Sequence, residues 1–551
     1  TLDDGTCLYS PFIFGCTDTS ALNYNPLATI DDSSCCYNSG PIWNQIGIDI
    51  DGEGSGDYFG HSLSISSNGS KIAIGGYYND GNGSNSGHVR VFENISGVWT
   101  QLGQDIDGES SGDGSSEVSL NDDGTIVAIG ARNNSTNGSY VGHSRVFEYS
   151  SGNWNQIGQN IYGSLSSEQA FGKSVSINSI GNKVAIGSND TPLNFGLVRV
   201  FQNISGSWNQ IGQDIFGETQ GDQSGRDIYL NSNGNILAIG SRFNDDNGTD
   251  AGHVRIYEYL SGVWTQIGQD IDGENPGDAA SYSIMNGSIA LSDDGSIIAM
   301  GALRNGDNGA YSGHVRIFEN IGGIWSQIGQ DIDGENAYDQ SGQSISLSSN
   351  GNILAIGSFG ANSYTGHVRI FKNISGNWTR IGQIIDGESL SDQCGQVSIS
   401  NDGTIIGVGA HFNSSSGHVR IYELDSLTTT PCNDLGCLDP LALNFDPYAT
   451  VDDSSCIYPN YGCLDTFALN YSQSANIEDG SCLYCTNDTS YVNLTACDSV
   501  VWNGTSYTQT GTYAYSYFPT IGTFINGGYI FYIDSVSDLA YIADSNFIGL
   551  S

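Results

Sequence analysis

Short hydrophobic runs recur along residues 42–424 as three phrases, and each phrase occurs seven times. Residues 344–357 represent the second phrase and residues 87–93 the third. The first phrase starts at a tryptophan each time: Trp43, Trp99, Trp154, Trp208, Trp264, Trp325 and Trp378. The runs are rich in Val, Ile, Phe and Trp and are separated by Asn-Gly, Asp-Gly and Ser-Gly pairs. This pattern predicts β-strands joined by tight turns.

Each repeat predicts four antiparallel strands, because the second phrase holds two strands around its own turn. Seven four-stranded repeats at nearly constant spacing predict an all-β fold with a seven-bladed β-propeller over residues 42–424. The chain enters this region with a tryptophan strand at 42–48 and leaves it after three strands at 396–423. We therefore expect the N-terminal strand to complete the last blade, which closes the ring and removes two open sheet edges.

A second repeat lies outside the propeller and carries most of the cysteines. Residues 15–35 recur as 436–456 and 462–482, with two cysteines 19 residues apart in each copy. Modules this small cannot bury enough surface unaided, so a disulfide, a metal ion or both is expected. The predicted pairs are Cys16 with Cys35, Cys437 with Cys456, and Cys463 with Cys482.

Four further cysteines lead to two further expected pairs. Cys36 precedes the first propeller strand and Cys432 follows the last, so ring closure would bring them together as a staple. Cys485 with Cys497 is the expected local pair. Cys394 lies in a strand phrase and is predicted to be a buried thiol.

The repeats divide the chain into seven parts. We expect the tail of a truncated Cys module at 1–9, a Cys module at 14–37, the propeller at 42–424, and Cys modules at 436–458 and 462–484. A small β module at 485–518 and the start of a further β domain at 519–551 complete the order. Because the sequence opens inside a module, we expect it to be a piece of a longer secreted polypeptide.

Charge and motifs narrow the function classes. The formal net charge is −44, which disfavours nucleic acids and anionic membrane surfaces and favours cations. There is no apolar run long enough to span a membrane, and the cysteines indicate an oxidising compartment. No nucleophile elbow, phosphate loop or zinc-protease signature is present, and nearly every polar motif is repeated. We therefore expect no enzymatic activity.

The strand phrases resemble the FG-GAP type of propeller known from integrin α-chain heads. The resemblance rests on Phe59-Gly-His-Ser-Leu-Ser, Ile72-Ala-Ile-Gly and Gly87-His-Val-Arg-Val-Phe. The Cys modules, and residues 496–507, resemble repeats of large secreted proteins of marine Bacteroidetes, and residues 527–534 are similar to the opening of a lectin-like domain of adhesins. These resemblances imply an extracellular, cell-surface location and export by type IX secretion.

Acidic residues after each tryptophan strand have the spacing of calcium ligands, at positions 1, 3, 5 and 9. The integrin-type calcium loop uses this spacing, although its turn glycine and its place in the blade differ. The alternative is a turn whose acids cap backbone amides or pair with arginine. Four copies keep all four acids: Asp49, Asp51, Glu53 and Asp57; Asp105, Asp107, Glu109 and Asp113; Asp270, Asp272, Glu274 and Asp278; and Asp331, Asp333, Glu335 and Asp339.

The Cys modules repeat their own set of oxygen ligands, and we predict that Ca²⁺ binds there. The alternative is a disulfide knot with a solvated acidic face. The candidate ligands are Asp18, Asn23, Asp31 and Asp32; Asp439, Asn444, Asp452 and Asp453; and Asp465, Asn470, Glu478 and Asp479.

The function that these observations favour is that of a non-enzymatic extracellular surface protein with an adhesive or structural, filament-forming role. The propeller would be a rigid interaction disc and the Cys modules spacers, with other copies, neighbouring domains or surface glycans as partners. The alternative is a carbohydrate-binding, lectin-like propeller. Exposed unpaired aromatic side chains on one propeller face would favour the lectin, and a featureless acidic face with ordered ends contacting neighbouring copies would favour the structural filament. The recurrent arginines and histidines of the third phrase are expected to pair with acids and to pack, respectively.

Overall fold

The structure is a computed structural model that describes residues 41–163, 169–281, 287–413, 416–425, 458–468 and 470–483. It also describes residues 14–15, 30–31, 435–436, 439–442, 451–452, 456, 500–502, 505–507, 513–514, 524–525, 528–534 and 539–544. The chain separates into two compact units, Thr1–Cys432 and Asn433–Ser551. Within the described residues, no helix has the length and apolar character needed to cross a membrane.

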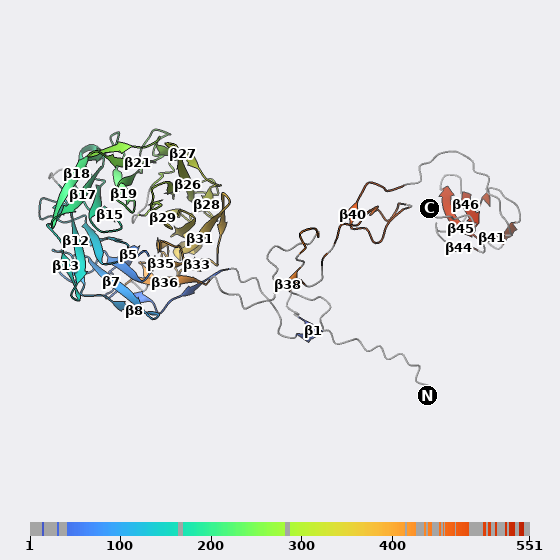
Figure 1. The fold of residues 1–551 in the computed structure, drawn as a ribbon, viewed down its shortest axis with the longest axis horizontal. Helices are drawn as coiled ribbons and strands as arrows, with labels where there is room; N and C mark the ends of the chain where they lie inside the picture. The colour runs from blue at the N-terminus through green and yellow to red at the C-terminus, as the bar shows by residue number, and fades with distance from the viewer. Residues whose placement is uncertain are drawn as a thin grey trace, which may run out of the picture. The chain divides into compact units, whose positions relative to one another are not determined.

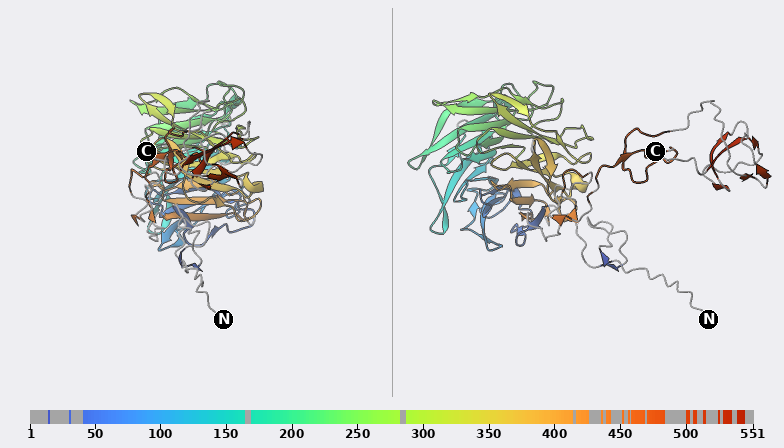
Figure 2. Two further views of the ribbon diagram at one scale, coloured as in Figure 1. Left: turned by 90° about the vertical axis from the view of Figure 1, so that its right-hand side faces the viewer. Right: turned by 45° about the vertical axis from the view of Figure 1, so that its right-hand side comes forward.

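Seven antiparallel sheets form the blades of a closed propeller, as the repeats predict. The blades follow one another around the ring in chain order, so that β36 returns beside the first blade (Figure 1). Figure 2 shows the same ring from two further sides. The innermost strands are β5 (Phe59–Ile65), β10 (Ser115–Leu120), β15 (Ser174–Ile177), β19 (Ser224–Leu230), β24 (Ile289–Leu291), β29 (Ser341–Leu347) and β34 (Gln396–Ile399).

The second and third strands of each blade are the most hydrophobic ones. The second strands are β6 (Lys71–Gly76), β11 (Ile126–Ala131), β16 (Lys183–Ser188), β20 (Ile236–Ser241), β25 (Ile297–Ala302), β30 (Ile353–Ser358) and β35 (Ile405–Ala410). The third strands are β7 (His88–Ile95), β12 (His143–Ser150), β17 (Leu197–Ile204), β21 (His253–Leu260), β26 (His314–Ile321), β31 (His367–Ile374) and β36 (His418–Asp425). Both strands are covered on their two faces by neighbouring blades, which explains their nearly continuous apolar runs.

The outer strand of most blades is split by a bend. Its first parts are β3 (Ile42–Gln45), β8 (Val98–Gln101), β13 (Asn153–Gln156), β22 (Val263–Gln266), β27 (Ile324–Gln327) and β32 (Asn377–Arg380). Its second parts are β4 (Ile50–Asp51), β9 (Ile106–Asp107), β14 (Ile161–Tyr162), β23 (Ile271–Asp272), β28 (Ile332–Asp333) and β33 (Ile385–Asp386). In the third blade one strand, β18 (Ser207–Phe216), spans both parts. Short helical turns occur at η1 (Pro192–Asn194) and α1 (Ala361–Tyr364).

The N-terminal strand closes the ring as predicted. Strand β3 pairs antiparallel with β36, with Trp43 opposite Leu424, and β4 continues along the same strand. The last blade therefore has the order β3-β36-β35-β34. On the inner side, the Ser398 hydroxyl accepts a hydrogen bond from the Ile65 amide of the first blade at 3.0 Å. The two ends of the propeller are thus joined at both its outer and its inner strands.

A repeated clasp links the outer strand of a blade to the next blade at six of the seven junctions. Gln104 exchanges two hydrogen bonds with the backbone of Trp154, at 3.0 and 2.8 Å, and the Trp154 indole donates to the Leu102 carbonyl at 2.7 Å. Gln383 makes the same pair of bonds with Trp43 across the ring closure, at 2.9 and 2.6 Å. The clasp explains why Gln and Trp recur in the first phrase: both are needed to join consecutive blades.

The three Cys modules share one backbone pairing. Strands β1 (Phe14–Gly15) and β2 (Ile30–Asp31), β37 (Leu435–Gly436) and β38 (Val451–Asp452), and β39 (Tyr461–Gly462) and β40 (Ile477–Glu478) are parallel pairs with the same register. A disulfide joins Cys463 to Cys482, with their Cα atoms 4.8 Å apart, and Cys456 is also disulfide-bonded. Cys394 is a free, fully buried thiol. Cys16, Cys35, Cys36, Cys432, Cys437, Cys485 and Cys497 lie outside the described residues, so their predicted pairings stay predictions.

The C-terminal segment contains a hairpin and a sheet. The hairpin pairs β41 (Val500–Trp502) with β42 (Thr505–Tyr507). The sheet has the order β43 (Tyr513–Ala514), β46 (Leu539–Asp544), β45 (Gly528–Asp534), β44 (Phe524–Ile525). Because β43 pairs with β46, the module boundary that we expected at residue 518 falls within this sheet.

Candidate functional site on one face of the propeller

The acidic loops and the loops between the second and third strands leave from the same face of the ring. This follows from the alternating direction of four antiparallel strands, which places the start of the first and third strands at the same end. We call this side the loop face. The tight hairpin turns lie on the opposite face. The residues that the sequence singled out as ligands are therefore concentrated on the loop face.

The four acids of one loop do not surround a single point. Asp49 faces His418 of the last blade, with Oδ2 3.6 Å from Nδ1, whereas Glu53 faces His88 of the first blade, with Oε2 3.9 Å from Nδ1. The Asp51 carbonyl accepts a hydrogen bond from Arg90 at 2.6 Å, and its side chain is exposed. The acids of one loop thus contribute to several different environments.

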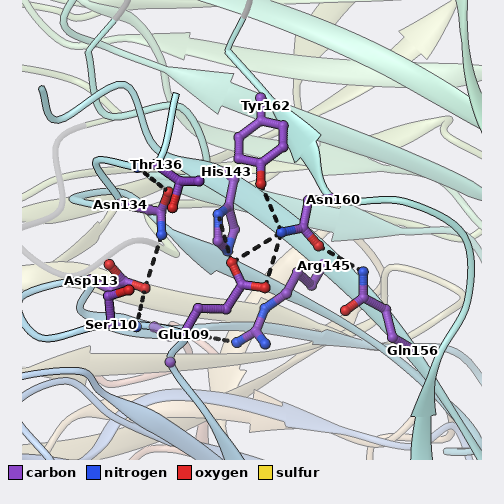
Figure 3. Close-up of polar contacts among 12 residues, drawn as sticks. Glu109, Ser110, Asp113, Asn134, Thr136, His143, Arg145, Gln156, Asn160 and Tyr162 are labelled. Carbon is purple, nitrogen blue, oxygen red and sulfur yellow. Dashed lines mark hydrogen bonds and ion pairs between the residues drawn. The ribbon is translucent and has the colours of Figure 1, made fainter. Parts of the chain in front are cut away.

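The last acid of each loop caps its own turn. Asp57 accepts a hydrogen bond from the Gly54 amide at 2.7 Å and one from the Asn79 side chain at 3.2 Å. Asp113 does the same with the Ser110 amide and Asn134, both at 2.9 Å (Figure 3). Asp278 and Asp339 cap the amides of Asn275 and Asn336. These buried carboxylates fulfil the turn-capping alternative, and a calcium site formed by all four acids of a loop does not fit this arrangement.

The acids of the other three complete loops make the same kinds of contact as those of the first loop. The carbonyls of Asp107, Asp272 and Asp333 accept hydrogen bonds from Arg145, Arg316 and Arg369. Glu109, Glu274 and Glu335 lie beside the arginine or histidine of the next blade. Asp105, Asp270 and Asp331 accept hydrogen bonds from Gln101, Gln266 and Gln327 of the strand before them.

Burial sets the charge state of the histidines in these clusters. The imidazoles of His88, His143 and His253 are fully buried, and desolvation lowers their pKa to about 4, with the neighbouring arginines acting in the same direction. They are therefore neutral near pH 7. The arginines of the third phrase pair with acids as expected, for example Arg199 with Asp214 at 2.8 Å and Arg255 with Glu218 at 3.5 Å.

The acids of the described Cys module are used within the module. Glu478 accepts hydrogen bonds from the amides of Leu464 and Gly480, at 2.7 and 2.9 Å. Asp465 and Asp479 accept bonds from the amides of Phe467 and Ser481, and Asn470 bonds to Ser481 and Leu483. Asp439 accepts from the Leu441 amide and the Tyr458 hydroxyl. The side chains of Asp18, Asn23, Asp31, Asp32, Asn444, Asp452 and Asp453 lie outside the described residues.

Exposed tyrosines are a feature of the loop face that the sequence pattern does not reveal. Tyr140 and Tyr338 are more than half exposed, and Tyr311 and Tyr364 each expose 46% of their surface. The Tyr311 and Tyr338 rings stack, with centroids 6.0 Å apart and planes 15° from parallel. On the opposite face the exposed residues are aliphatic hairpin tips such as Ile321 and Ile324, both 61% exposed. The two faces of the ring therefore differ in chemistry.

One family model agrees with the propeller fold. Residues 49–92 match the family model described as FG-GAP repeat. No curated protein matches the sequence. Similar solved structures include hydrazine synthase of Kuenenia stuttgartiensis, with 13% identity, TM-score 0.43, and coverage of 68% of this chain and 96% of that one. A putative 6-phosphogluconolactonase from Bacteroides fragilis has 15% identity, TM-score 0.41 and coverage of 60% and 85%. The WD40 repeats of RRP9 have 12% identity, TM-score 0.43 and coverage of 70% and 100%. At these scores the solved structures carry no argument about function.

Proposed function

We propose that the chain is part of a non-enzymatic extracellular adhesion protein whose propeller binds its partner with the loop face. The observation that carries this proposal is the set of exposed tyrosines on that face, headed by the stacked pair Tyr311 and Tyr338. Tyrosine offers a large, rigid, amphipathic contact surface that loses little conformational entropy on binding, which is why it is enriched in binding surfaces. The Cys463–Cys482 disulfide supports an extracellular location, because such bonds persist in oxidising compartments.

The same observation favours a carbohydrate as the partner. Sugar rings present flat apolar faces edged by hydroxyl groups, and exposed tyrosines offer matching flat rings and a phenolic hydroxyl. The net charge of −44 disfavours anionic polysaccharides and leaves neutral ones as the better fit. A neutral surface glucan is therefore the ligand class that we propose.

Binding of the full chain to laminarin, a neutral soluble glucan, tests this proposal by isothermal titration. The double variant Tyr311→Ala/Tyr338→Ala is expected to lose at least about tenfold in affinity, because each aromatic contact residue contributes about 1 kcal/mol or more. Tyr461→Ala, which removes a 64%-exposed tyrosine from a Cys module, is the control and should bind normally. Equal affinity of all three proteins, or no binding to laminarin, would contradict the proposal.

We propose calcium for the Cys modules alone. The support is that Asp31, Asp452 and Glu478 occupy the same position at the end of three equivalent strands, so each module repeats one acidic site. The amide bonds of Glu478 leave lone pairs on both oxygens free for a cation. Titration of the metal-free chain to about 10 mM Ca²⁺ should raise the melting temperature of the modules and leave that of the propeller unchanged. An unchanged melt of the modules would leave their acids as backbone caps only.

A further inference from the structure

One imidazole nitrogen and at least two carboxylate oxygens converge at four of the seven blades. Each cluster contains the histidine that starts the third strand, a glutamate from the loop entering the blade, and an aspartate that follows the outer strand, and the cluster of the fourth blade also contains Asp246. Within each cluster, the ligand atoms all lie within 4.8 Å of one another. The clusters are Glu53, His88 and Asp105; Glu218, Asp246, His253 and Asp270; Glu274, His314 and Asp331; and Glu388, His418 and Asp49.

Neighbouring side chains hold each carboxylate by its other oxygen. In the last blade, Gln45 donates to Asp49 Oδ1 at 2.7 Å, which leaves Oδ2 facing His418 at 3.6 Å. Arg420 lies 3.8 Å from Glu388 Oε1, which leaves Oε2 facing the same imidazole at 3.8 Å. Such outer partners orient metal ligands in established metal sites. The arrangement therefore presents two oxygens and one nitrogen toward a common point.

Unpartnered nitrogen atoms of the histidines are a second, independent indication that these clusters bind a ligand. The Nδ1 atoms of His88, His253 and His314 are buried and have no hydrogen-bond partner in the described part of the chain. The distances from these atoms to the facing glutamate oxygens are 3.9, 4.0 and 3.6 Å, too long for hydrogen bonds. A buried imidazole nitrogen without a partner is costly, and a metal ion bound between it and the carboxylates would satisfy it.

The second blade shows what happens when the aspartate is missing. Asn160 takes its place, and the Asn160 amide donates to both oxygens of Glu109, at 3.1 and 3.0 Å (Figure 3). Gln156 holds Asn160 as other glutamines hold the aspartates. The amide nitrogen thus takes the place of a cation beside the glutamate, while the buried Nδ1 of His143 has no hydrogen-bond partner in the described part of the chain.

The other two blades also replace the cluster with internal donors. In the sixth blade Ile384 stands where the aspartate would be, and Arg380 reaches Glu335 at 3.5 Å. In the third blade the glutamate and histidine positions hold Ser164 and Leu197, and Asp214 pairs with Arg199 through two hydrogen bonds of 2.9 and 2.8 Å. The glutamate and the histidine are therefore lost together, as expected of residues that share one ligand.

We propose that the four complete clusters bind divalent ions of the zinc class, one at each of the first, fourth, fifth and seventh blades. One imidazole nitrogen with two carboxylate oxygens suits Zn²⁺ and similar ions, whereas Ca²⁺ and Mg²⁺ prefer oxygen alone. Donor atoms at about 2.0–2.2 Å from one ion in tetrahedral geometry lie about 3.3–3.6 Å apart. The distances of 3.6 to 4.0 Å between imidazole nitrogen and carboxylate oxygen are a few tenths of an ångström longer, and no two ligand atoms of a cluster are more than 4.8 Å apart. Water would fill the remaining position.

The test counts bound Zn²⁺ on the full chain by equilibrium dialysis and elemental analysis. The buffer contains about 0.15 M salt and about 10 mM Mg²⁺ to suppress unspecific binding to the acidic surface. Asp105→Asn converts the first cluster into a copy of the second blade and should remove one Zn²⁺ per chain. Asn160→Asp supplies the missing acid and should add one. Because blade 2 already folds with asparagine at this position, Asp105→Asn is expected to fold.

Asp51→Asn is the matched control, because it removes the same charge from an exposed side chain of the same type of loop and should leave the count unchanged. Substitution of Co²⁺ for Zn²⁺ gives a second readout, a visible absorption band that should change with Asp105→Asn and not with Asp51→Asn. The proposal is overturned if the Zn²⁺ count does not respond to Asp105→Asn and Asn160→Asp, or if Ca²⁺ competes with Zn²⁺ on equal terms.

Discussion

Single residues decide how each blade attaches to the next. The clasp between glutamine and tryptophan occurs at six blade junctions. At the seventh, the position of the glutamine is held by Ile48, which is 83% exposed, and the facing Trp99 is the least buried of the seven strand tryptophans. This junction between the last and the first blade is therefore the least tightly bonded one on the outer side.

Ile48→Gln is expected to stabilise the propeller by completing the seventh clasp. Two added hydrogen bonds to the Trp99 backbone should contribute about 1 kcal/mol, seen as a rise of about 1–3 °C in the melting temperature. Ile180→Gln is the control, because Ile180 is similarly exposed and has no clasp position. A melting temperature no higher than that of the control would contradict the role of the clasp.

Buried histidines make the stability of the propeller depend on pH. The folded pKa values of His88, His143 and His253 lie near 4 and below the ordinary value near 6.5. Between these values the unfolded chain binds more protons than the folded one, so stability is lost as pH falls from about 6.5 to about 4, by at most about 1.4 kcal/mol per pH unit for each histidine.

His143→Leu should make this loss less steep by about one proton, because Leu197 already occupies the same position in the third blade. Denaturant unfolding between pH 7 and 4.5, with a chelator present, measures the slope. The same slope in the variant and the parent chain would show that His143 takes up its proton equally in both states.

At the scale of elements, the strand pattern and the ring closure could be predicted from the sequence because each repeat carries its own complete set of signals. The phase of the repeats alone placed residues 42–48 beside β36. Which acids lie together could not be predicted from the sequence in this way. A loop that crosses between two blades distributes its acids over both of them. Asp49 and Glu53 are four residues apart and lie in different clusters.

A signal for the clusters is nevertheless present in the sequence. Ser164 and Leu197 break the glutamate and histidine patterns in the same blade, and aligning the three phrases shows this joint loss. The exposed tyrosines carry no such signal, because sequence spacing does not reveal which loop residues face solvent. Tyr311 and Tyr338 come from two loops, and their stacking is visible only in the structure.

Deletion of residues 1–50 tests the closure element. The last blade would lose β3 and β4, the clasp between Trp43 and Gln383, and the pairing of Asp49 with His418. An open edge then remains, so the propeller should unfold at a lower temperature and over a broader range. Deletion of residues 1–40 is the control, because it leaves both strands in place. Equal melting curves for the two deletions would contradict the closure.

At the scale of the whole molecule, the ring presents two different faces on one rigid scaffold. Its inner strands are joined by hydrogen bonds from backbone amides to serine hydroxyls, and its outer strands by the clasp. Loops on such a scaffold can vary while the ring stays intact, which is a common arrangement for binding surfaces. We therefore propose that the partner binds on the loop face, while the serine hydrogen bonds and the clasp hold the blades together.

Hydroxyl-radical footprinting of the full chain with and without laminarin tests this central claim most directly, because it reports the solvent exposure of individual side chains. We expect laminarin to protect tyrosines of the loop face, above all Tyr311 and Tyr338, and to leave Ile321 and Ile324 on the opposite face as reactive as before. Protection of the hairpin tips with no change at the tyrosines would contradict it.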